Sequence, residues 1–184
     1  MGRQEQTNHL FSNRDLRILL VPLIVEQILN SLMGTADSIM VSNVGSAAIS
    51  AVSLVDSINI LVIQAFYALA AGGTIVCSQY IGQKDKKNAE ESARQLSFVV
   101  ACISSAVMAV CLLTRGPLLR LIFGSVEADV MEAAQIYFFY TALSFPFIAL
   151  YDAGSSIYRA QGNTRLPMTI AVVSNGLNIA GNAV

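Results

Sequence analysis

The sequence has few charged residues. Only 12% of its 184 residues are Asp, Glu, Lys or Arg, whereas 54% are hydrophobic. An ordinary soluble domain carries about 25% charged residues, so this chain has too few to cover a water-facing surface. The composition indicates an integral membrane protein and argues against a cytosolic enzyme domain. Eleven basic residues against twelve acidic ones leave no basic excess, which argues against a nucleic-acid partner.

The sequence also lacks the common motifs of metal sites and catalytic centres. Its three cysteines, Cys77, Cys102 and Cys111, form no Cys-x-x-Cys or Cys/His group, so neither a disulfide framework nor a zinc site is predicted. No G-x-x-x-x-G-K-[ST] loop, G-x-S-x-G elbow or H-E-x-x-H helix occurs. We therefore expect no enzymatic activity and no cofactor. If the chain drives transport, an ion gradient is the expected energy source.

Five apolar runs are long enough to cross a bilayer. A bilayer core needs roughly 20 apolar residues in a helix, and such runs occupy residues 18–41, 47–80, 96–113, 130–153 and 166–184. The expected fold is an all-α membrane bundle of about five helices. Residues 1–17 form an N-terminal tail without a signal-peptide cleavage site, and residues 18–184 form a transmembrane lobe. The last run reaches the chain end without a flanking charge, so we expect this lobe to be truncated.

Basic residues are distributed unevenly between the connections. If the N-terminus is cytoplasmic, the inner segments hold nine Lys and Arg and the outer segments two, a strong positive-inside signal. The nine are Arg3, Arg14, Arg17, Lys84, Lys86, Lys87, Arg94, Arg159 and Arg165, and the two are Arg115 and Arg120. This asymmetry predicts a cytoplasmic N-terminus. The outer connection 115–129 is either a short helix in the headgroup layer or a few extra turns of the neighbouring helix.

Acidic residues lie inside the first run, where charges are costly. Glu26 and Asp37 are eleven residues apart, which at roughly 100° per residue places them within about 20° of each other on one helix face. Asn30 lies on the same stripe. Intramembrane acids usually mark ion or substrate pathways, although a structural role is the alternative for either acid. Pro22 is predicted to bend this helix, as a hinge or as a static kink.

A second polar stripe occupies the last run. Asn175, Asn178 and Asn182 are spaced i, i+3 and i+7, and residues at this spacing share one helix face. Their amides can coordinate a cation or join helices by hydrogen bonds. The spacing alone favours the hydrogen-bonding role.

Several segments of the chain together carry a resemblance to a known family. They are Pro22 to Gln27 (PLIVEQ), Ala36 to Val41 (ADSIMV), Ser78 to Gly82 (SQYIG) and Tyr158 to Met168 (YRAQGNTRLPM). The first two are similar to the opening helix of the multidrug and toxic compound extrusion (MATE) transporters, including the fifteen-residue step from proline to aspartate. The others resemble that family's first cytoplasmic loop and the loop before its fifth helix.

The resemblance implies a twelve-helix transporter of two six-helix lobes, which exports cationic or amphipathic compounds across the plasma membrane in exchange for Na⁺ or H⁺. This chain would supply helices one to four and most of helix five, without the second lobe. The family's first-lobe cation site uses a first-helix aspartate and a fifth-helix asparagine, which fall on Asp37 and Asn178.

The sequence departs from the family pattern at one position that bears on the coupling ion. Some members have an aspartate four residues after that asparagine, where this sequence has Asn182; the missing charge leaves the choice between Na⁺ and H⁺ open. We expect Glu26, Gln27 and Asn30 to face the substrate cavity, and Pro22 to act as the hinge.

Other function classes fit parts of the sequence. An exporter of lipid-linked or polysaccharide precursors has a similar helical plan, but a more cationic cavity would be expected for that cargo. Tyr151-Asp152 matches the first aspartate motif of intramembrane aspartyl proteases, whose second motif, Gly-x-Gly-Asp, is absent. A purely structural membrane subunit is a third alternative. A second lobe of similar spacing in the following gene sequence would favour the transporter.

Overall fold

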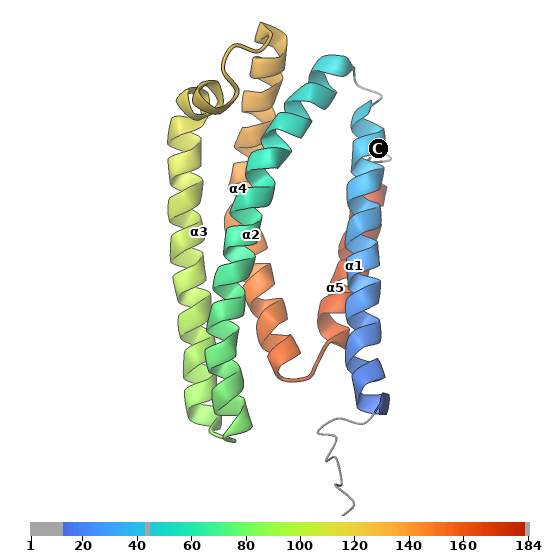
Figure 1. The fold of residues 1–184 in the computed structure, drawn as a ribbon, viewed down its shortest axis with the longest axis vertical. Coiled ribbons are helices and arrows are strands. Elements are labelled where there is room, and N and C mark those ends of the chain that lie inside the picture. The colour runs from blue at the N-terminus through green and yellow to red at the C-terminus, as the bar shows by residue number, and fades with distance from the viewer. Residues whose placement is uncertain (1–12, 43–44, 183–184) are drawn as a thin grey trace, which may run out of the picture.

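The fold is a bundle of long helices. The computed structural model describes residues 13–42 and 45–182, and within these ranges every regular element is an α-helix (Figure 1). The helices are α1 (Asn13–Ser42), α2 (Ser46–Gly82), α3 (Lys86–Phe123), α4 (Ala128–Ala160) and α5 (Arg165–Asn182). The all-α prediction is confirmed, and each apolar run lies within one helix as far as the described residues extend.

Short connections reverse the chain between successive helices (Figure 1). In the α2–α3 turn, Asp85 caps α3 by accepting a hydrogen bond from the Asn88 backbone nitrogen at 3.2 Å, which satisfies one of the free amides at a helix start. In the α4–α5 turn, Gly162 adopts φ 79°, a conformation that favours glycine. Both turns lie at the end of the bundle where α1 begins, hereafter the basic end.

Helices α2, α3 and α4 pack extensively against one another and form a three-helix unit. Its core includes Val55, Val100 and Phe138, all fully buried, and an edge-to-face contact between Phe66 and Phe145 with ring centroids 5.9 Å apart. Helix α1 packs chiefly on α5 and only sparsely on α2. The lobe therefore consists of the three-helix unit and a separate α1–α5 pair (Figure 1).

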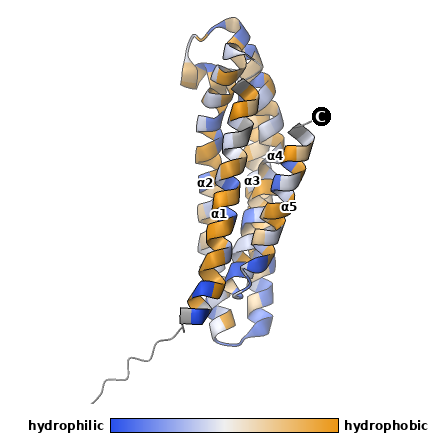
Figure 2. Ribbon diagram, turned by 90° about the vertical axis from the view of Figure 1, so that its right-hand side faces the viewer, coloured by the Kyte–Doolittle hydropathy of each residue, from blue (hydrophilic) through white to orange (hydrophobic). Residues whose placement is uncertain are grey.

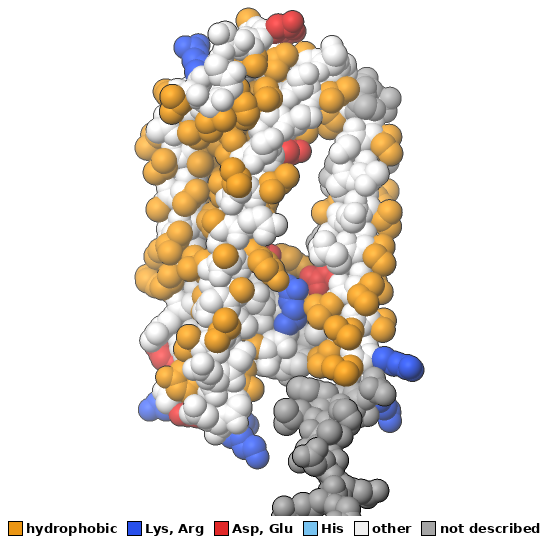
Figure 3. Space-filling view, viewed as in Figure 1, with side chains coloured by type: hydrophobic (Ala, Val, Ile, Leu, Met, Phe, Trp, Pro, Cys, Tyr) orange, Lys and Arg blue, Asp and Glu red, His pale blue; other side chains and the backbone are white. Residues whose placement is uncertain are grey.

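The outer faces of the bundle are apolar (Figures 2 and 3). Leu61, Leu113 and Phe147 are 73%, 84% and 76% exposed, a surface suited to lipid and unsuited to water. Helices α1 to α4 are each long and apolar enough to cross a membrane. Helix α5 has 18 residues and is not among these four, because its asparagines and Arg165 lower its hydropathy.

Helix α3 is longer than its apolar run. It continues through Pro117 to Phe123, and its last turns tilt away from the rest of the helix (Figure 1), as expected where proline removes a backbone hydrogen bond. Leu119 is fully buried, whereas Leu121 is 83% exposed. The sequence allows two interpretations of the outer connection 115–129, a separate short helix or extra turns of the neighbouring helix. The structure shows extra turns of α3, which end at Phe123.

Candidate cation and substrate site

A cleft separates the α1–α5 pair from the three-helix unit. It has a volume of about 550 Å³ and forms the hollow in the middle of Figure 3, with acidic and basic side chains near its lower end. We call it the α1–α4 cleft. Its lining residues come from three helices: Leu23, Glu26, Gln27 and Asn30 of α1, Ile63, Gln64 and Tyr67 of α2, and Tyr151, Asp152 and Arg159 of α4.

Glu26 is the buried acid on the α1 side. It is only 5% exposed, and its Oε1 atom accepts a hydrogen bond from the Tyr151 hydroxyl at 3.4 Å. The same oxygen lies 3.7 Å from Nη2 of Arg159. Among the described residues, Oε2 of Glu26 is buried without a hydrogen-bond partner. These contacts join α1 to α4 across the cleft and leave one carboxylate oxygen available.

The α4 side of the cleft carries the second acid and the base. Asp152 and Arg159 are seven residues apart, close to two full turns, so they share one face of α4. Arg159 donates from Nε to the Ser155 carbonyl oxygen at 3.2 Å, which holds its side chain along the helix. Within the described part of the chain, Oδ2 of Asp152 is also buried without a partner.

Buried charges of this kind are costly unless they are compensated. Two carboxylates and one guanidinium line the cleft, and its acids present two unpartnered oxygens, Oε2 of Glu26 and Oδ2 of Asp152. Such an arrangement can bind a positively charged group. The side-chain amides of Gln27, Asn30 and Gln64 and the ring of Tyr67 complete the lining and supply hydrogen-bonding and aromatic surface.

A further polar cluster lies between α2 and α4. The Tyr137 hydroxyl donates to Oδ1 of Asp56 at 3.1 Å, and the Asn59 amide donates to the same atom at 3.4 Å. These residues line a cavity of about 300 Å³ together with Thr141 and Ser144. Asp56 is thus a hydrogen-bonded link between two helices of the three-helix unit.

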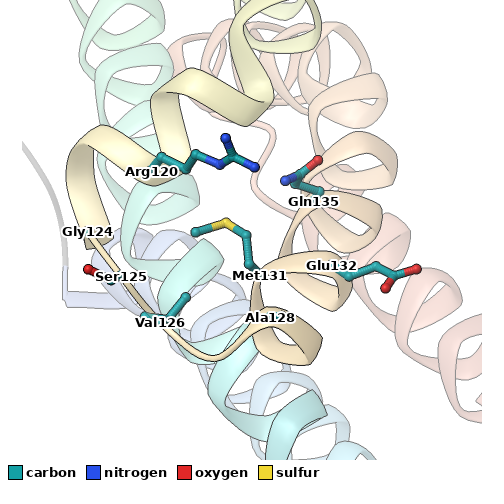
Figure 4. A pocket seen from close by; sticks show the side chains of 8 residues that line it. All are labelled: Arg120, Gly124, Ser125, Val126, Ala128, Met131, Glu132 and Gln135. Carbon is teal, nitrogen blue, oxygen red and sulfur yellow. The ribbon is translucent and has the colours of Figure 1, made fainter.

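A hollow of about 590 Å³ lies at the α3–α4 turn, away from the basic end. In Figure 4, the guanidinium of Arg120 extends toward Gln135, Met131 lies between the two helices, and Glu132 points away from Arg120. The hollow lacks the buried acids of the α1–α4 cleft and is an open surface feature at one end of the bundle.

Comparison with known proteins identifies the family. The sequence signature of the MatE family matches residues 22–184. The chain belongs to the MatE family. It is 33% identical over 180 residues to the uncharacterized transporter YisQ of Bacillus subtilis (strain 168), covering 98% of this chain and 38% of YisQ. It is 26% identical over 169 residues to a probable multidrug resistance protein NorM of Thermotoga maritima, covering 90% of this chain and 35% of NorM.

Solved structures of MATE transporters share the fold. A MOP superfamily transporter from Pyrococcus furiosus superimposes with a TM-score of 0.85 at 22% identity, over 92% of this chain and 37% of that one. An outward-facing multidrug resistance MATE transporter gives the same TM-score, identity and coverage. The chain therefore spans less than two fifths of the length of these relatives, and the predicted MATE resemblance is confirmed.

The α1–α4 cleft contains the residues that we expect from the sequence to face the substrate cavity. Glu26, Gln27 and Asn30 all line it; that they contact the substrate stays a prediction. Pro22 is buried, and α1 is continuous through it; its role as a hinge stays a prediction.

The expected cation-coupling residues lie on the paired helices α1 and α5. Asn178 is half-buried on α5, whereas the side chains of Asp37 and Asn182 lie outside the described residues. Asn175 is buried, and its amide donates to the Ala171 carbonyl oxygen of its own helix at 2.8 Å. This hydrogen bond lies within α5, so it does not join α5 to another helix.

Sequence reasoning missed the α4 half of the cleft. On sequence alone, Asp152 fits only a protease motif and Arg159 only a topology signal. Their common helix face, seven residues apart within a mainly apolar helix, was the available sign that they act together. Local sequence patterns do not show that this face meets Glu26, because the ion pair joins Glu26 to Arg159, which lies far along the chain.

Proposed function

We propose that this chain forms most of the first lobe of a two-lobed MATE exporter. The transporter moves cationic or amphipathic small molecules out of the cell across the plasma membrane, in exchange for Na⁺ or H⁺. The observation that carries the proposal is the acid-lined α1–α4 cleft within a MatE-family bundle. The probable multidrug resistance proteins among the relatives support the same conclusion.

The chemistry of the cleft supports a cationic, partly apolar cargo. Its volume of about 550 Å³ falls within the ~300–1,000 Å³ range of small-molecule sites. Leu23, Ile63 and Tyr67 offer apolar and aromatic contact, and Glu26 and Asp152 offer negative charge. An anionic precursor would meet two acids and a single base, which argues against the polysaccharide-precursor alternative.

We assign ion coupling to the carboxylate of Asp37. The amide oxygens of Asn178 and Asn182 are the other two ligands. The proposal is supported by the packing of α1 on α5, the helices that carry these residues. Carboxylate and amide oxygens suit a hard cation such as Na⁺, and a carboxylate in a poorly solvated position can equally take a proton. Asp37 is eleven residues beyond Glu26, about 16 Å along the helix, so the ion and the cargo occupy separate positions.

The membrane orientation follows from charge. The α2–α3 and α4–α5 turns and the start of α1 share the basic end, and nine of the eleven Lys and Arg lie in these segments or in the tail before them. We place this end in the cytoplasm. The α1–α4 contacts of Glu26 then lie in the cytoplasmic half of the lobe, and Asp37 lies toward the outer side.

The full-length transporter reconstituted in liposomes tests the proposal. A lipophilic monocation such as tetraphenylphosphonium is loaded inside, and a Na⁺ gradient or a proton gradient is imposed separately. We expect efflux that depends on one of the two gradients and that fails in Asp37→Asn protein of wild-type yield and melting temperature. Efflux that is independent of both gradients, or absent from the wild type, would overturn the proposal.

A further inference from the structure

The charges of the α1–α4 cleft do not balance. Of the described residues that line it, Glu26 and Asp152 are the acids and Arg159 is the one base. With these three ionised, the cleft carries one net negative charge. A net charge beside the buried Glu26 is costly because little water reaches that carboxylate. The charges of these described residues therefore balance only when one further positive charge enters.

The single base forms its ion pair with one of the two acids. Among the described residues, the ion pair of Arg159 is with Glu26, at 3.7 Å, and its Nε atom is held by the Ser155 carbonyl oxygen. Glu26 also receives the Tyr151 hydroxyl. Asp152, in contrast, keeps a buried oxygen without a partner in the described structure. A further positive charge that enters the cleft therefore lies beside the Asp152 carboxylate.

The size of the cleft favours an organic cation over a bare ion. A volume of about 550 Å³ far exceeds the roughly 30 Å³ that one water molecule occupies in the liquid. The lining places Leu23, Ile63 and Tyr67 beside the acids. An aromatic face and aliphatic groups suit the apolar body of an organic cation whose charged centre approaches a carboxylate.

We propose that Arg159 sets the number of positive charges that the cargo carries. The cleft takes an organic monocation with its charge at Asp152, and it disfavours a dication because Arg159 has already neutralised Glu26. A second positive charge on the cargo finds no acid and is repelled by the guanidinium. This inference rests on the proposed function and assigns Arg159 as a specificity-determining residue of the same site.

The expected discrimination follows from Coulomb's law. Two like charges about 7 Å apart at an effective dielectric constant near ~20 repel enough to change an affinity on the order of fiftyfold. Water and mobile ions reduce this value, so we expect a preference of at least about tenfold for the monocation. Replacing Arg159 by a neutral residue leaves two acids uncompensated, which removes the repulsion and adds a binding position for the second charge.

Two probes of the same shape and different charge test the inference. N-methyl-4-phenylpyridinium carries one charge and methyl viologen carries two on a nearly identical two-ring body. Their dissociation constants are measured on the full-length protein in nanodiscs. We expect the wild type and Arg159→Lys to favour the monocation, and Arg159→Gln to shift the ratio of the two constants toward the dication by at least about tenfold.

A double variant separates charge from structural damage. Arg159→Gln/Asp152→Asn restores one net negative charge, on Glu26, but lacks the guanidinium, so we expect its ratio of the two constants to lie between those of the wild type and of Arg159→Gln. Asp152→Asn alone leaves no net charge and should weaken monocation binding by about tenfold or more. Glu91→Gln, which removes an exposed acid outside the cleft, is the matched control and should change neither constant.

The outcomes distinguish the inference from the proposed function. If the wild type binds or exports neither probe, the proposed function fails and the inference fails with it. If the wild type binds both probes and their ratio is the same in Arg159→Gln and in the double variant, the proposed function stands and the role of Arg159 is refuted. Melting temperatures identify unfolded variants; if Arg159→Gln does not fold, the double variant and Asp152→Asn decide the question.

Discussion

The contact between α2 and α3 at Gly73 offers the sharpest test of the packing. A Cβ added to Gly73 would overlap the Cδ1 atom of Leu96 and lie 3.0 Å from its Cγ. Leu96 is buried, so its side chain would have to turn away from Gly73, beside the hollow of about 260 Å³ that both residues line. Overpacking of this kind costs about 1–3 kcal/mol. The neighbouring Gly72 provides a matched control, since a Cβ there meets no atom of the described structure within 4 Å.

The comparison of the two alanine variants isolates the packing cost. Alanine replaces glycine in the same helix in both, and the gain of up to about 1 kcal/mol in helix propensity is common to them. We therefore expect Gly73→Ala to be less stable than Gly72→Ala by about 1–3 kcal/mol. The free energy of unfolding is measured for the full-length protein by reversible denaturation in mixed micelles.

A second substitution completes the test. In a Gly73→Ala background, Leu96→Ala removes the atoms that the new methyl group meets, so the double variant should lose less stability than the sum of the two single losses. Additive losses, or a Gly73→Ala variant as stable as Gly72→Ala, would show that the two helices do not approach closely at this position.

The remaining predictions concern orientation, coupling and helix contacts. In a cysteine-free background, an impermeant thiol reagent applied to intact cells should label a cysteine at Val44 and spare one at Lys86. Asp37→Asn should abolish ion-driven efflux with membrane insertion intact, whereas Glu26→Gln should weaken substrate binding more than coupling, as measured by transport and binding in parallel. Tyr137→Phe removes the hydrogen bond from α4 to the α2 carboxylate and should reduce the unfolding free energy by about 0.6–1.7 kcal/mol.

Each of these predictions has a contrary outcome. Labelling at 86 and protection at 44 would invert the orientation of the whole lobe. Wild-type efflux and ion dependence in Asp37→Asn would transfer the coupling role to Glu26 or to a carboxylate of the second lobe. An unchanged unfolding free energy in Tyr137→Phe would mean that the hydroxyl is equally well bonded to water or to another group in the unfolded state.

The helices could be predicted from the sequence because they depend on local patterns. Continuous apolar runs and polar interruptions identify the helical segments, and the stripe of Glu26 and Asn30 indicates which face of α1 avoids lipid. These predictions use only residues within one or two turns of each other. The length of α3 was less predictable, because its helix continues into polar residues that hydropathy assigns to connections.

The partners of the buried acids could not be predicted in the same way. Glu26 meets Arg159 and Tyr151 of α4 only because α1 stands beside the three-helix unit. Asp56 meets Tyr137 across 81 positions of sequence. Such contacts depend on which helices become neighbours, and the hydropathy of a single helix contains no information about its neighbours.

The long separation between Glu26 and its partners has a consequence for how the lobe is made. Tyr151 is translated 125 residues after Glu26, and Arg159 later still. At a synthesis rate of ~5–20 residues per second, this interval lasts on the order of 6–25 seconds. During it, α1 enters the membrane with an acid that lacks its counter-ion, at a cost of about 2.5–3.5 kcal/mol at the centre of the bilayer and less toward its surface. The nascent α1 bears this cost until α4 emerges, unless it remains at the membrane surface, binds a proton or stays with the insertion machinery.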